Sequence, residues 1–197
     1  MGTTKETVFR IIGASNHTIH DRETHDFYAT DPCAIDYLLA GGVKLSRNIW
    51  EPSCGEGHLS KRLEELGYNV KSTDLIYRNY GDGGIDFLQC QEKFAGDILT
   101  NPPYSLAQRF VEHALELIPD GNKVIMFLKL TFLEGKKRRV LFDRQCLKTL
   151  YVSSGRILCA KNGDFEGIRK SGGSAVAYGW FVFEKGFCGD PIIKWIN

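Results

Sequence analysis

Short apolar runs alternate along the chain with stretches in which apolar residues recur every three or four positions. A run of roughly four to eight apolar residues between turn residues is typical of a buried strand, whereas the wider spacing is typical of an amphipathic helix. Alternating strands and helices build α/β folds with a mostly parallel sheet. The pattern therefore predicts a doubly wound α/β sheet that binds its ligand at the carboxyl ends of the strands.

The expected strands cover the start of 48–57 and the segments 69–74, 98–100, 123–129, 149–154 and 175–183, and a further short apolar run lies at 83–88. The expected helices begin at Pro32, after the glycine-rich loop of 51–57, at Leu106 and near the basic run 136–139. Because the run 123–129 is apolar throughout, it is expected to be a buried parallel strand.

The run that begins at Ile98 stops at Asn101-Pro102-Pro103-Tyr104. Proline has a fixed φ and no N–H, so the two prolines take the backbone out of the sheet and leave carbonyl groups unpaired. The Asn101 side-chain oxygen and the Pro102 carbonyl then form an acceptor pair for the two hydrogens of a planar amine, as in adenine, cytosine or a carboxamide. Holding both hydrogens turns the nitrogen lone pair towards an electrophile without a strong base. The Tyr104 ring is a platform on which such a group stacks.

The segment 48–57 turns from a strand into a loop that contains Gly55 and Gly57, and a helix follows. Glycine lets the backbone pass close to a ligand, and the N-terminus of the helix points at the loop. The loop begins with the acidic Glu51 and lacks the Lys-Ser/Thr pair of a P-loop, which disfavours phosphate as the ligand. A carboxylate suits the cationic amino group of a methionine moiety better. A simple tight turn is the alternative, and the downstream Asn-Pro-Pro-Tyr motif favours the ligand loop.

Asp74 lies at the end of the next expected strand. An acid about 20 residues after a glycine loop is where nucleotide-binding α/β units hold the ribose hydroxyls. Leu75 and Ile76 follow and are placed to pack on an adenine ring. The alternative is a strand-end Asp that caps its own loop, so the ribose role depends on its register with the glycine loop.

The Asn-Pro-Pro-Tyr motif, together with EPSCGEG at 51–57, resembles the amino-methyltransferases that use S-adenosylmethionine, in particular the adenine-N6 group. From DFYATDP at 26–32 to the C-terminal EKGFCGDPIIKWI, the chain is similar to small phage and prophage methyltransferases of the adenine-N6 DNA type. The resemblance implies a Rossmann-like seven-stranded methyltransferase sheet whose last strand is antiparallel. It also implies methyl transfer from S-adenosyl-L-methionine to N6 of a flipped-out adenine in DNA, which leaves S-adenosyl-L-homocysteine.

The resemblance assigns catalysis to the four motif residues, Asn101, Pro102, Pro103 and Tyr104. It assigns cofactor binding to Tyr28, Thr30, Pro32, Glu51, Pro52, Ser53, Cys54, Gly55, Gly57, His58, Asp74, Leu75, Ile76, Asp86, Phe87 and Asn101. In the family, the segment around Tyr28 borders the methionine end of the cofactor, Asp86 accepts from its adenine amino group, and Phe87 lies beside the ring. For the segment around Pro32, a helix that is simply capped by Asp31 is an equally good explanation.

With 197 residues the chain fits one domain with a sizeable core, and we expect a methyltransferase domain at 26–197 after an N-terminal arm at 1–25. No apolar run reaches the roughly 20 residues that span a bilayer, and there is no signal-peptide pattern, so a cytoplasmic location is expected. By resemblance, the cell is a bacterial host or a phage-infected one. The six scattered cysteines contain no CxxC pair, which suits a reducing compartment, and no metal is expected.

A net charge of +1 lacks the basic field of most nucleic-acid binders, so any contact with DNA has to be local. Cations gather in the run 136–139 and in the connection 155–174, whose length is typical of functional loops. The candidate phosphate contacts are Lys136, Lys137, Arg138, Arg139, Arg156, Lys161, Arg169 and Lys170. For 136–139, a solvated surface is at least as good an explanation.

The residues after Tyr104 are used up by the remaining strands and helices, so no separate target-recognition domain fits. Specificity is then low, or it comes from the arm and the loop 155–174, or a partner subunit supplies it. The same chemistry on RNA adenine or on a protein glutamine amide is an alternative that the near-neutral charge favours and the order of the motifs disfavours. A non-catalytic cofactor-binding accessory subunit is a further alternative, against which the intact motif argues.

Overall fold

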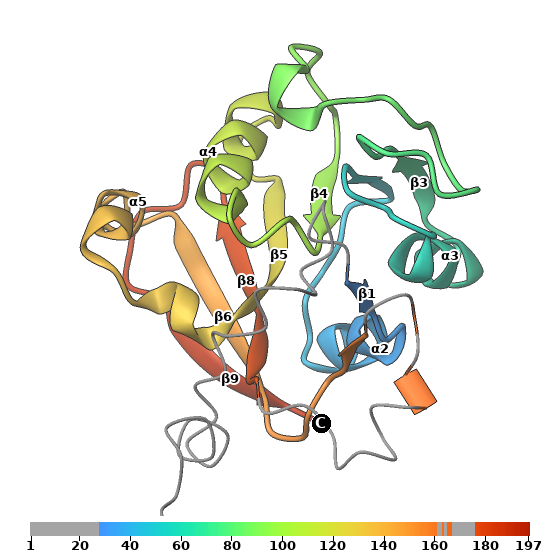
Figure 1. The fold of residues 1–197 in the computed structure, drawn as a ribbon. Coiled ribbons are helices and arrows are strands. Elements are labelled where there is room, and N and C mark those ends of the chain that lie inside the picture. Colours follow the sequence, from blue (N-terminus) through green and yellow to red (C-terminus); the bar gives the residue numbers. More distant parts are fainter. Residues whose placement is uncertain (1–27, 161–162, 164, 167–175) are drawn as a thin grey trace, which may run out of the picture.

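The computed structural model describes residues 28–160, 163, 165–166 and 176–197 (Figure 1). Within these residues the centre is a seven-stranded sheet in the order β3-β2-β4-β5-β8-β6-β9. In chain order its strands are β2 (Asn48–Glu51), β3 (Asn69–Ser72), β4 (Asp97–Thr100), β5 (Lys123–Lys129), β6 (Leu147–Ser153), β8 (Tyr178–Glu184) and β9 (Ile192–Ile196). A separate small sheet pairs β1 (Ala29–Thr30) with β7 (Cys159–Ala160).

Strands β3, β2, β4 and β5 run parallel to one another. Strand β8 runs antiparallel to both of its neighbours, β5 and β6. The segment expected at 175–183 is thus the antiparallel strand that the resemblance implied, and the doubly wound α/β class is confirmed. Strand β9 follows it along the chain and adds an edge strand parallel to β6, which the sequence pattern did not predict.

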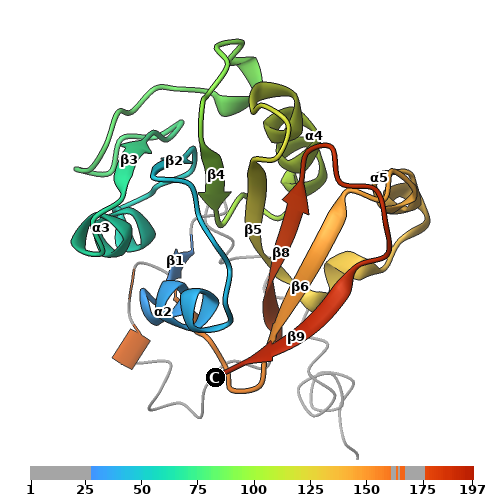
Figure 2. The same cartoon turned by 180° about the vertical axis from the view of Figure 1, so that it is seen from behind.

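Helices cover both faces of the sheet, as Figures 1 and 2 show. One face carries α2 (Cys33–Ala40) and α3 (His58–Glu65), and the opposite face carries α4 (Ala107–Leu117) and α5 (Arg139–Asp143). Short 3-10 turns occur at η1 (Phe87–Gln89), η2 (Leu130–Leu133) and η3 (Lys136–Arg138). In the part of the chain that the structure describes, no helix combines the length and the apolar character needed to cross a membrane.

The central strand β5 shows how the sequence fills both faces. Val124, Met126 and Leu128 face the layer that contains α4, whereas Ile125 and Phe127 face the layer that contains α2 and α3. All of these side chains are at most 1% exposed. Successive side chains of a strand point to opposite faces, so a run that is apolar throughout fills both cores. The buried strand expected at 123–129 is confirmed.

The helix starts lie close to those expected from the sequence. Helix α2 begins at Cys33, and the Asp31 carboxylate accepts a hydrogen bond of 3.1 Å from the Cys33 N–H, as a capping residue does. The apolar run 83–88 forms a loop that leads into η1, and the basic run forms η3 immediately before α5. The arm expected at 1–25 lies outside the described residues, as does part of the connection 155–174.

The carboxyl ends of the parallel strands meet at one edge of the sheet. Glu51 ends β2, Asn101 follows β4, and Lys129 ends β5. Tyr178 begins the antiparallel strand β8 and is paired with Lys129, so it reaches the same edge. Open α/β sheets bind their ligands at this edge.

Candidate active site

A cavity of about 860 Å³ opens at the carboxyl edge of the sheet, and its size is within the range of small-molecule and cofactor sites. Most of the residues expected at the cofactor and catalytic sites line it, namely Tyr28, Thr30, Glu51, Pro52, Ser53, Cys54, His58, Asp74, Leu75, Ile76, Asp86, Phe87, Asn101, Pro103 and Tyr104. The other expected residues, Pro32, Gly55, Gly57 and Pro102, do not line it. The fold thus brings segments that are far apart in the sequence to one cavity.

The glycines of the 51–57 loop set the path of its backbone. Gly55 and Gly57 have φ values of 55° and 80°, and Gly57 immediately precedes α3. Glycine adopts these left-handed conformations without penalty, and at Gly57 any side chain would collide with the Tyr80 ring. The Gly55 N–H donates to Asp74 Oδ2 at 2.8 Å. The loop backbone therefore holds the two expected cofactor segments together.

Glu51 is the acid at the end of β2, and only 2% of it is exposed. The Ser60 hydroxyl donates to its carboxylate and lies 2.7 Å from the Ser72 hydroxyl. Burial raises the pKa of Glu51 to about 8, and the hydrogen bonds from Ser60 offset only part of this effect. The carboxyl group is therefore mostly protonated at neutral pH, and a cation bound beside it would favour the ionised form.

Asp74 is 9% exposed, and both of its carboxylate oxygens accept hydrogen bonds. In addition to the bond from Gly55, Oδ1 accepts from the Ile76 N–H at 2.9 Å and from Arg78 Nη1 at 3.3 Å. Each carboxylate oxygen has two lone-pair positions, so capacity for hydroxyl donors remains. The carboxylate thus organises its own loop, as the alternative explanation held, and still presents itself to the cavity as the ribose role requires.

The run 83–88 brings Asp86 and Phe87 to the cavity wall. The Asp86 carboxylate caps η1 by accepting from a backbone N–H of that turn at 3.0 Å. The Phe87 side chain is 2% exposed and belongs to the core on the α4 face of the sheet. The Ile85 N–H donates to the Asp74 carbonyl at 3.0 Å, so the run lies directly beside the segment expected at the ribose.

The Asn101 side-chain amide is fixed by Tyr28, by Thr30 of β1 and by Cys159 of β7. Nδ2 donates to the Tyr28 carbonyl at 3.2 Å and to Thr30 Oγ1 at 2.9 Å, and Cys159 Sγ lies 3.8 Å away. Because the Tyr28 carbonyl only accepts, the amide nitrogen must face it and Oδ1 must face the other way. Oδ1 is buried and has no hydrogen-bond partner among the described residues. A buried acceptor in this state is costly unless a ligand supplies a donor.

The two prolines of the motif differ in their surroundings. Pro102 is buried behind the cavity wall, whereas Pro103 lines the cavity. The Pro103 carbonyl accepts from the Leu106 N–H at 2.9 Å, where the chain turns into α4. The Pro103 carbonyl is thus engaged in starting the helix, so the Pro102 carbonyl remains the expected backbone partner of Asn101 in the acceptor pair.

Tyr104 belongs to a cluster of aromatic rings beside Asn101. Its ring stacks with that of Tyr28, with 6.2 Å between centroids and 27° between planes. Its hydroxyl lies 3.2 Å from that of Tyr178, and burial raises the pKa of Tyr104 well above its usual range. Lys129 Nζ lies 4.4 Å from the Tyr104 ring centroid, in a cation–π contact. The expected stacking platform is therefore an aromatic cluster with a cation beside it.

Several residues that line the cavity were not predicted as site residues. Strands β1 and β7 have two residues each, which is too short for a periodic signal, yet they supply Ala29 and Cys159. The other unpredicted residues are Leu59, Arg78, Ile85, Ser105, Leu106, Phe110, Lys129, Val176 and Tyr178. Of these, Lys129 ends an expected strand at the ligand edge, and that position was a usable signal.

The candidate phosphate contacts differ in their surroundings. Lys136, Lys137 and Arg138 line a second cavity next to the first one. Arg139 forms an ion pair of 2.6 Å with Asp143 on α5. Arg156 is exposed and lines neither of the two cavities. The other three candidates, Lys161, Arg169 and Lys170, lie outside the described residues.

Solved structures share this fold at low sequence identity. A putative class I S-adenosylmethionine-dependent methyltransferase from Listeria monocytogenes aligns with 89% of this chain and 68% of its own, at 11% identity and a TM-score of 0.61. A type I restriction-modification methyltransferase subunit from Streptococcus thermophilus aligns with 85% of this chain and 46% of its own, at 13% identity and a TM-score of 0.59. A putative RNA methyltransferase from Pyrococcus horikoshii aligns with 94% of this chain and 100% of its own, at 14% identity and a TM-score of 0.56.

No protein-family model and no curated protein matches the sequence. The chain has the Rossmann-like sheet of the S-adenosylmethionine-dependent methyltransferases, as these structures and the strand order show. It spans about half the length of the type I subunit, at 46% of that chain. Likeness at this level of identity establishes the fold, and the activity has to be argued from the site itself.

Proposed function

We propose that this protein is a methyltransferase that transfers a methyl group from S-adenosyl-L-methionine to the exocyclic N6 amine of adenine in DNA. The observation that carries the proposal is the buried Oδ1 of Asn101, which has no partner among the described residues while Nδ2 is held by Tyr28 and Thr30. Asn101 shares its cavity with the acids Glu51 and Asp74. A planar amine that enters this cavity brings the donor that Oδ1 lacks.

The polar groups of the cavity fit S-adenosyl-L-methionine. Glu51 is a buried acid whose ionised form needs a nearby cation, and the ammonium group of the methionine moiety is such a cation. Asp74 would accept from the ribose hydroxyls, and Asp86 with Phe87 would border the adenine ring. When it is bound, the cofactor supplies an electrophilic methyl group on its sulfonium centre.

Residues of this chain prepare the amine for transfer. Asn101 Oδ1 and the Pro102 carbonyl each accept one hydrogen of the amine, which turns the nitrogen lone pair towards the methyl group. The same two acceptors stabilise the positive charge that develops on nitrogen as the new N–C bond forms. The methylated nitrogen then gives up one proton to solvent. Tyr104 holds the plane of the base, and because the acceptors are fixed before the substrate arrives, little reorganisation is needed.

Adenine in DNA is the substrate that best accounts for the motifs. Their order along the chain, with the Tyr28 segment first, then the glycine loop and then Asn101, resembles that of the DNA enzymes. A base inside a duplex cannot reach a cavity, so it has to be unpaired or flipped out of the stack. The ring cluster around Tyr104 would replace the stacking that the base loses.

Adenine in RNA is the second candidate substrate. It is favoured by the putative RNA methyltransferase from Pyrococcus horikoshii, which aligns over its whole length with this chain. The same acceptor pair also suits a glutamine amide of a protein. A cofactor-binding accessory subunit without turnover would have no use for the buried acceptor on Asn101.

The proposal is tested by incubating the purified protein with S-adenosylmethionine that carries a labelled methyl group, in parallel with DNA, RNA and protein extract. Digestion and nucleoside analysis are expected to find the label in N6-methyladenine from DNA. Label in RNA or in glutamine would identify RNA or protein, instead of DNA, as the substrate. Absence of label from all three, with the cofactor bound in calorimetry, would overturn the enzymatic role.

A further inference from the structure

A second cavity, of about 510 Å³, lies next to the proposed active site, and the two share Tyr104, Ser105 and Lys129 in their linings. The second cavity extends from these residues to η2, η3 and the start of α4. The chain segment between β5 and α5, drawn in yellow in Figure 1, contains η2 and η3. Its volume is in the range of ligand sites.

The lining of the second cavity is cationic. It includes Lys129, Lys136, Lys137 and Arg138, and none of the described residues that line it is acidic. The Arg138 guanidinium is already engaged, because Nη1 donates to two backbone carbonyls at 3.0 and 2.8 Å and the group lies over the Phe132 ring. Lys136 and Lys137 are exposed and form no ion pair with the described residues. Their charges are therefore available to an anion.

The N-terminus of α4 adds to this positive potential. Ala107 and Gln108 of its first turn line the second cavity, the turn contains no acid, and Leu106 before it provides no side-chain cap. The first N–H groups of a helix lack intrahelical acceptors and carry the positive end of its dipole. An anion in this cavity thus meets lysine side chains on one side and a helix N-terminus on another.

Lys129 stands where the two cavities meet. It is the last residue of β5, and its ammonium group lies over the ring of Tyr104, the platform proposed for the target base. A base stacked on Tyr104 is attached to a sugar and a phosphate, and the border that the two cavities share at Lys129 offers them a route out of the first cavity. The cation is therefore placed to meet the phosphate next to the target nucleotide.

We propose that the second cavity binds the neighbouring nucleotide of an unpaired nucleic-acid strand, with its phosphates held by Lys129, Lys136 and Lys137. This inference rests on the proposed function, because the target base occupies the first cavity. It supplies a local basic site in a chain whose net charge is +1. A strand held by its phosphates needs no contact with base edges.

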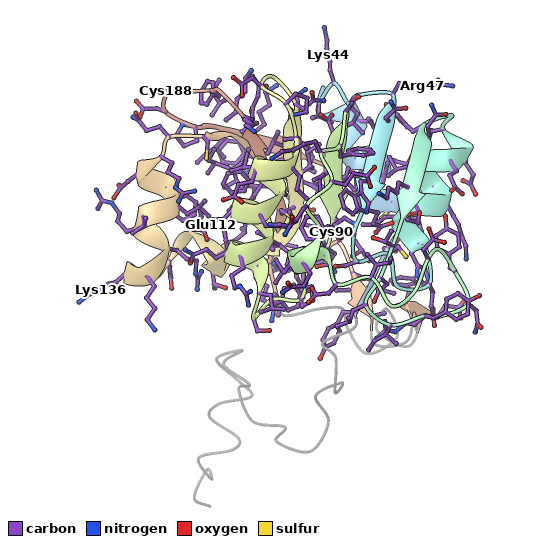
Figure 3. All side chains as sticks on the ribbon, turned by 90° about the horizontal axis from the view of Figure 1, so that it is seen from above. Lys44, Arg47, Cys90, Glu112, Lys136 and Cys188 are labelled. Atoms are coloured by element: carbon purple, nitrogen blue, oxygen red, sulfur yellow. The ribbon has the colours of Figure 1, made fainter. Side chains whose placement is uncertain are left out.

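The test uses a single-stranded oligodeoxynucleotide with one central adenine, its duplex, and the RNA strand of the same sequence. Binding is measured by fluorescence anisotropy at several salt concentrations, and methyl transfer is measured on the same samples. The variant is Lys136→Ala combined with Lys137→Ala. The matched control is Lys44→Ala combined with Arg47→Ala, two exposed cations that lie on the opposite side of the molecule from Lys136 in Figure 3.

We expect the wild-type protein to bind the single strand more tightly than the duplex. Each phosphate contact on a single strand contributes about 0.7 to the slope of log affinity against log salt, so the double lysine variant is expected to lower that slope by about 1.4. The control variant is expected to keep the wild-type slope. DNA and RNA strands carry the same phosphate groups, so both are expected to bind. The strand that binds with the higher affinity identifies the natural substrate.

An unchanged slope and affinity in the lysine variant, with methyl transfer intact, would overturn this inference while leaving the proposed function in place. Equal or tighter binding of the duplex would overturn it as well. Strand binding that depends on the lysines, without methyl transfer to any substrate, would instead contradict the proposed function. The substituted side chains are exposed, so both variants are expected to melt at the wild-type temperature. Melting curves test whether misfolding causes a change in binding.

Discussion

The strongest prediction about the cofactor concerns the coupling of its binding to a proton on Glu51. This carboxyl group is buried at the end of β2, and burial raises its pKa to about 8. At pH 7 it is therefore ionised in roughly one molecule in ten. In the proposed complex, the ammonium group of S-adenosylmethionine would select the ionised form, so binding would remove the proton from the remaining molecules.

The expected dependence follows from this population. Below the pKa of about 8, the ionised fraction rises about tenfold for each pH unit, and the cofactor affinity is expected to rise in proportion between pH 6 and 7. Above that pKa the affinity levels off. Calorimetry in buffers with different ionisation enthalpies is expected to detect release of nearly one proton per cofactor at pH 7. The measurement also applies to the product S-adenosylhomocysteine, which has the same ammonium group.

Two variants distinguish a specific role of Glu51 from a general effect of removing a carboxylate. Glu51→Gln is expected to abolish the pH dependence and to bind at least tenfold more weakly at pH 8. Glu92→Gln replaces an exposed glutamate that pairs with Lys71 at 3.6 Å, and it is expected to behave as the wild type. A flat affinity between pH 6 and 8 with no proton release, or full affinity in Glu51→Gln, would refute the role of Glu51 in holding the ammonium group.

Further predictions concern stability and the positioning of Asn101. Because burial raises the pKa of Glu51, the wild type loses unfolding free energy as the pH rises through about 8. Glu51→Gln is therefore expected to raise Tm more at pH 9 than at pH 5. An equal change in Tm at both pH values would contradict the raised pKa of Glu51. Gly57→Ala forces a φ of 80° on alanine and brings its Cβ against the Tyr80 ring. Urea unfolding is therefore expected to show a free energy of unfolding that is lower by about 1–3 kcal/mol. An unchanged free energy of unfolding would refute the strain argument. Thr30→Val removes the acceptor 2.9 Å from Asn101 Nδ2 and is expected to lower kcat, whereas Thr30→Ser keeps that acceptor and retains activity. Equal kcat values in Thr30→Val and the wild type would show that Thr30 does not position the amide.

The strands and the residues at their ends were predictable because their signals are local. The segment 123–129 has only apolar residues between its two terminal lysines and has the bounds of β5 in the structure. Asn101 was identified from the chemistry of its neighbours, since two prolines must end a strand. The structure adds what no local pattern contains, namely that Tyr28 and Thr30 fix the amide and orient its oxygen.

Residues whose role depends on strand order were missed. Tyr178 reaches the site only because β8 is inserted antiparallel beside β5, and its pairing with Lys129 is a property of the sheet. Arg78 lies in a loop, and only the turn after Asp74 brings the two together at 3.3 Å. Strand β9 is the edge strand of the sheet, and of its five residues only Ile196 is buried.

The central claim is that the buried oxygen of Asn101 accepts a hydrogen bond from the amine that is methylated. The most direct test measures methyl transfer to adenine-containing DNA and the calorimetric cofactor affinity on the same preparations of wild type and Asn101→Ala, with Asn69→Ala as an exposed control. Loss of one preorganised polar contact to the reacting group is expected to reduce the rate by roughly 100-fold or more. We expect this loss in a variant that still binds the cofactor. Transfer by Asn101→Ala at a rate comparable to the wild type would contradict it.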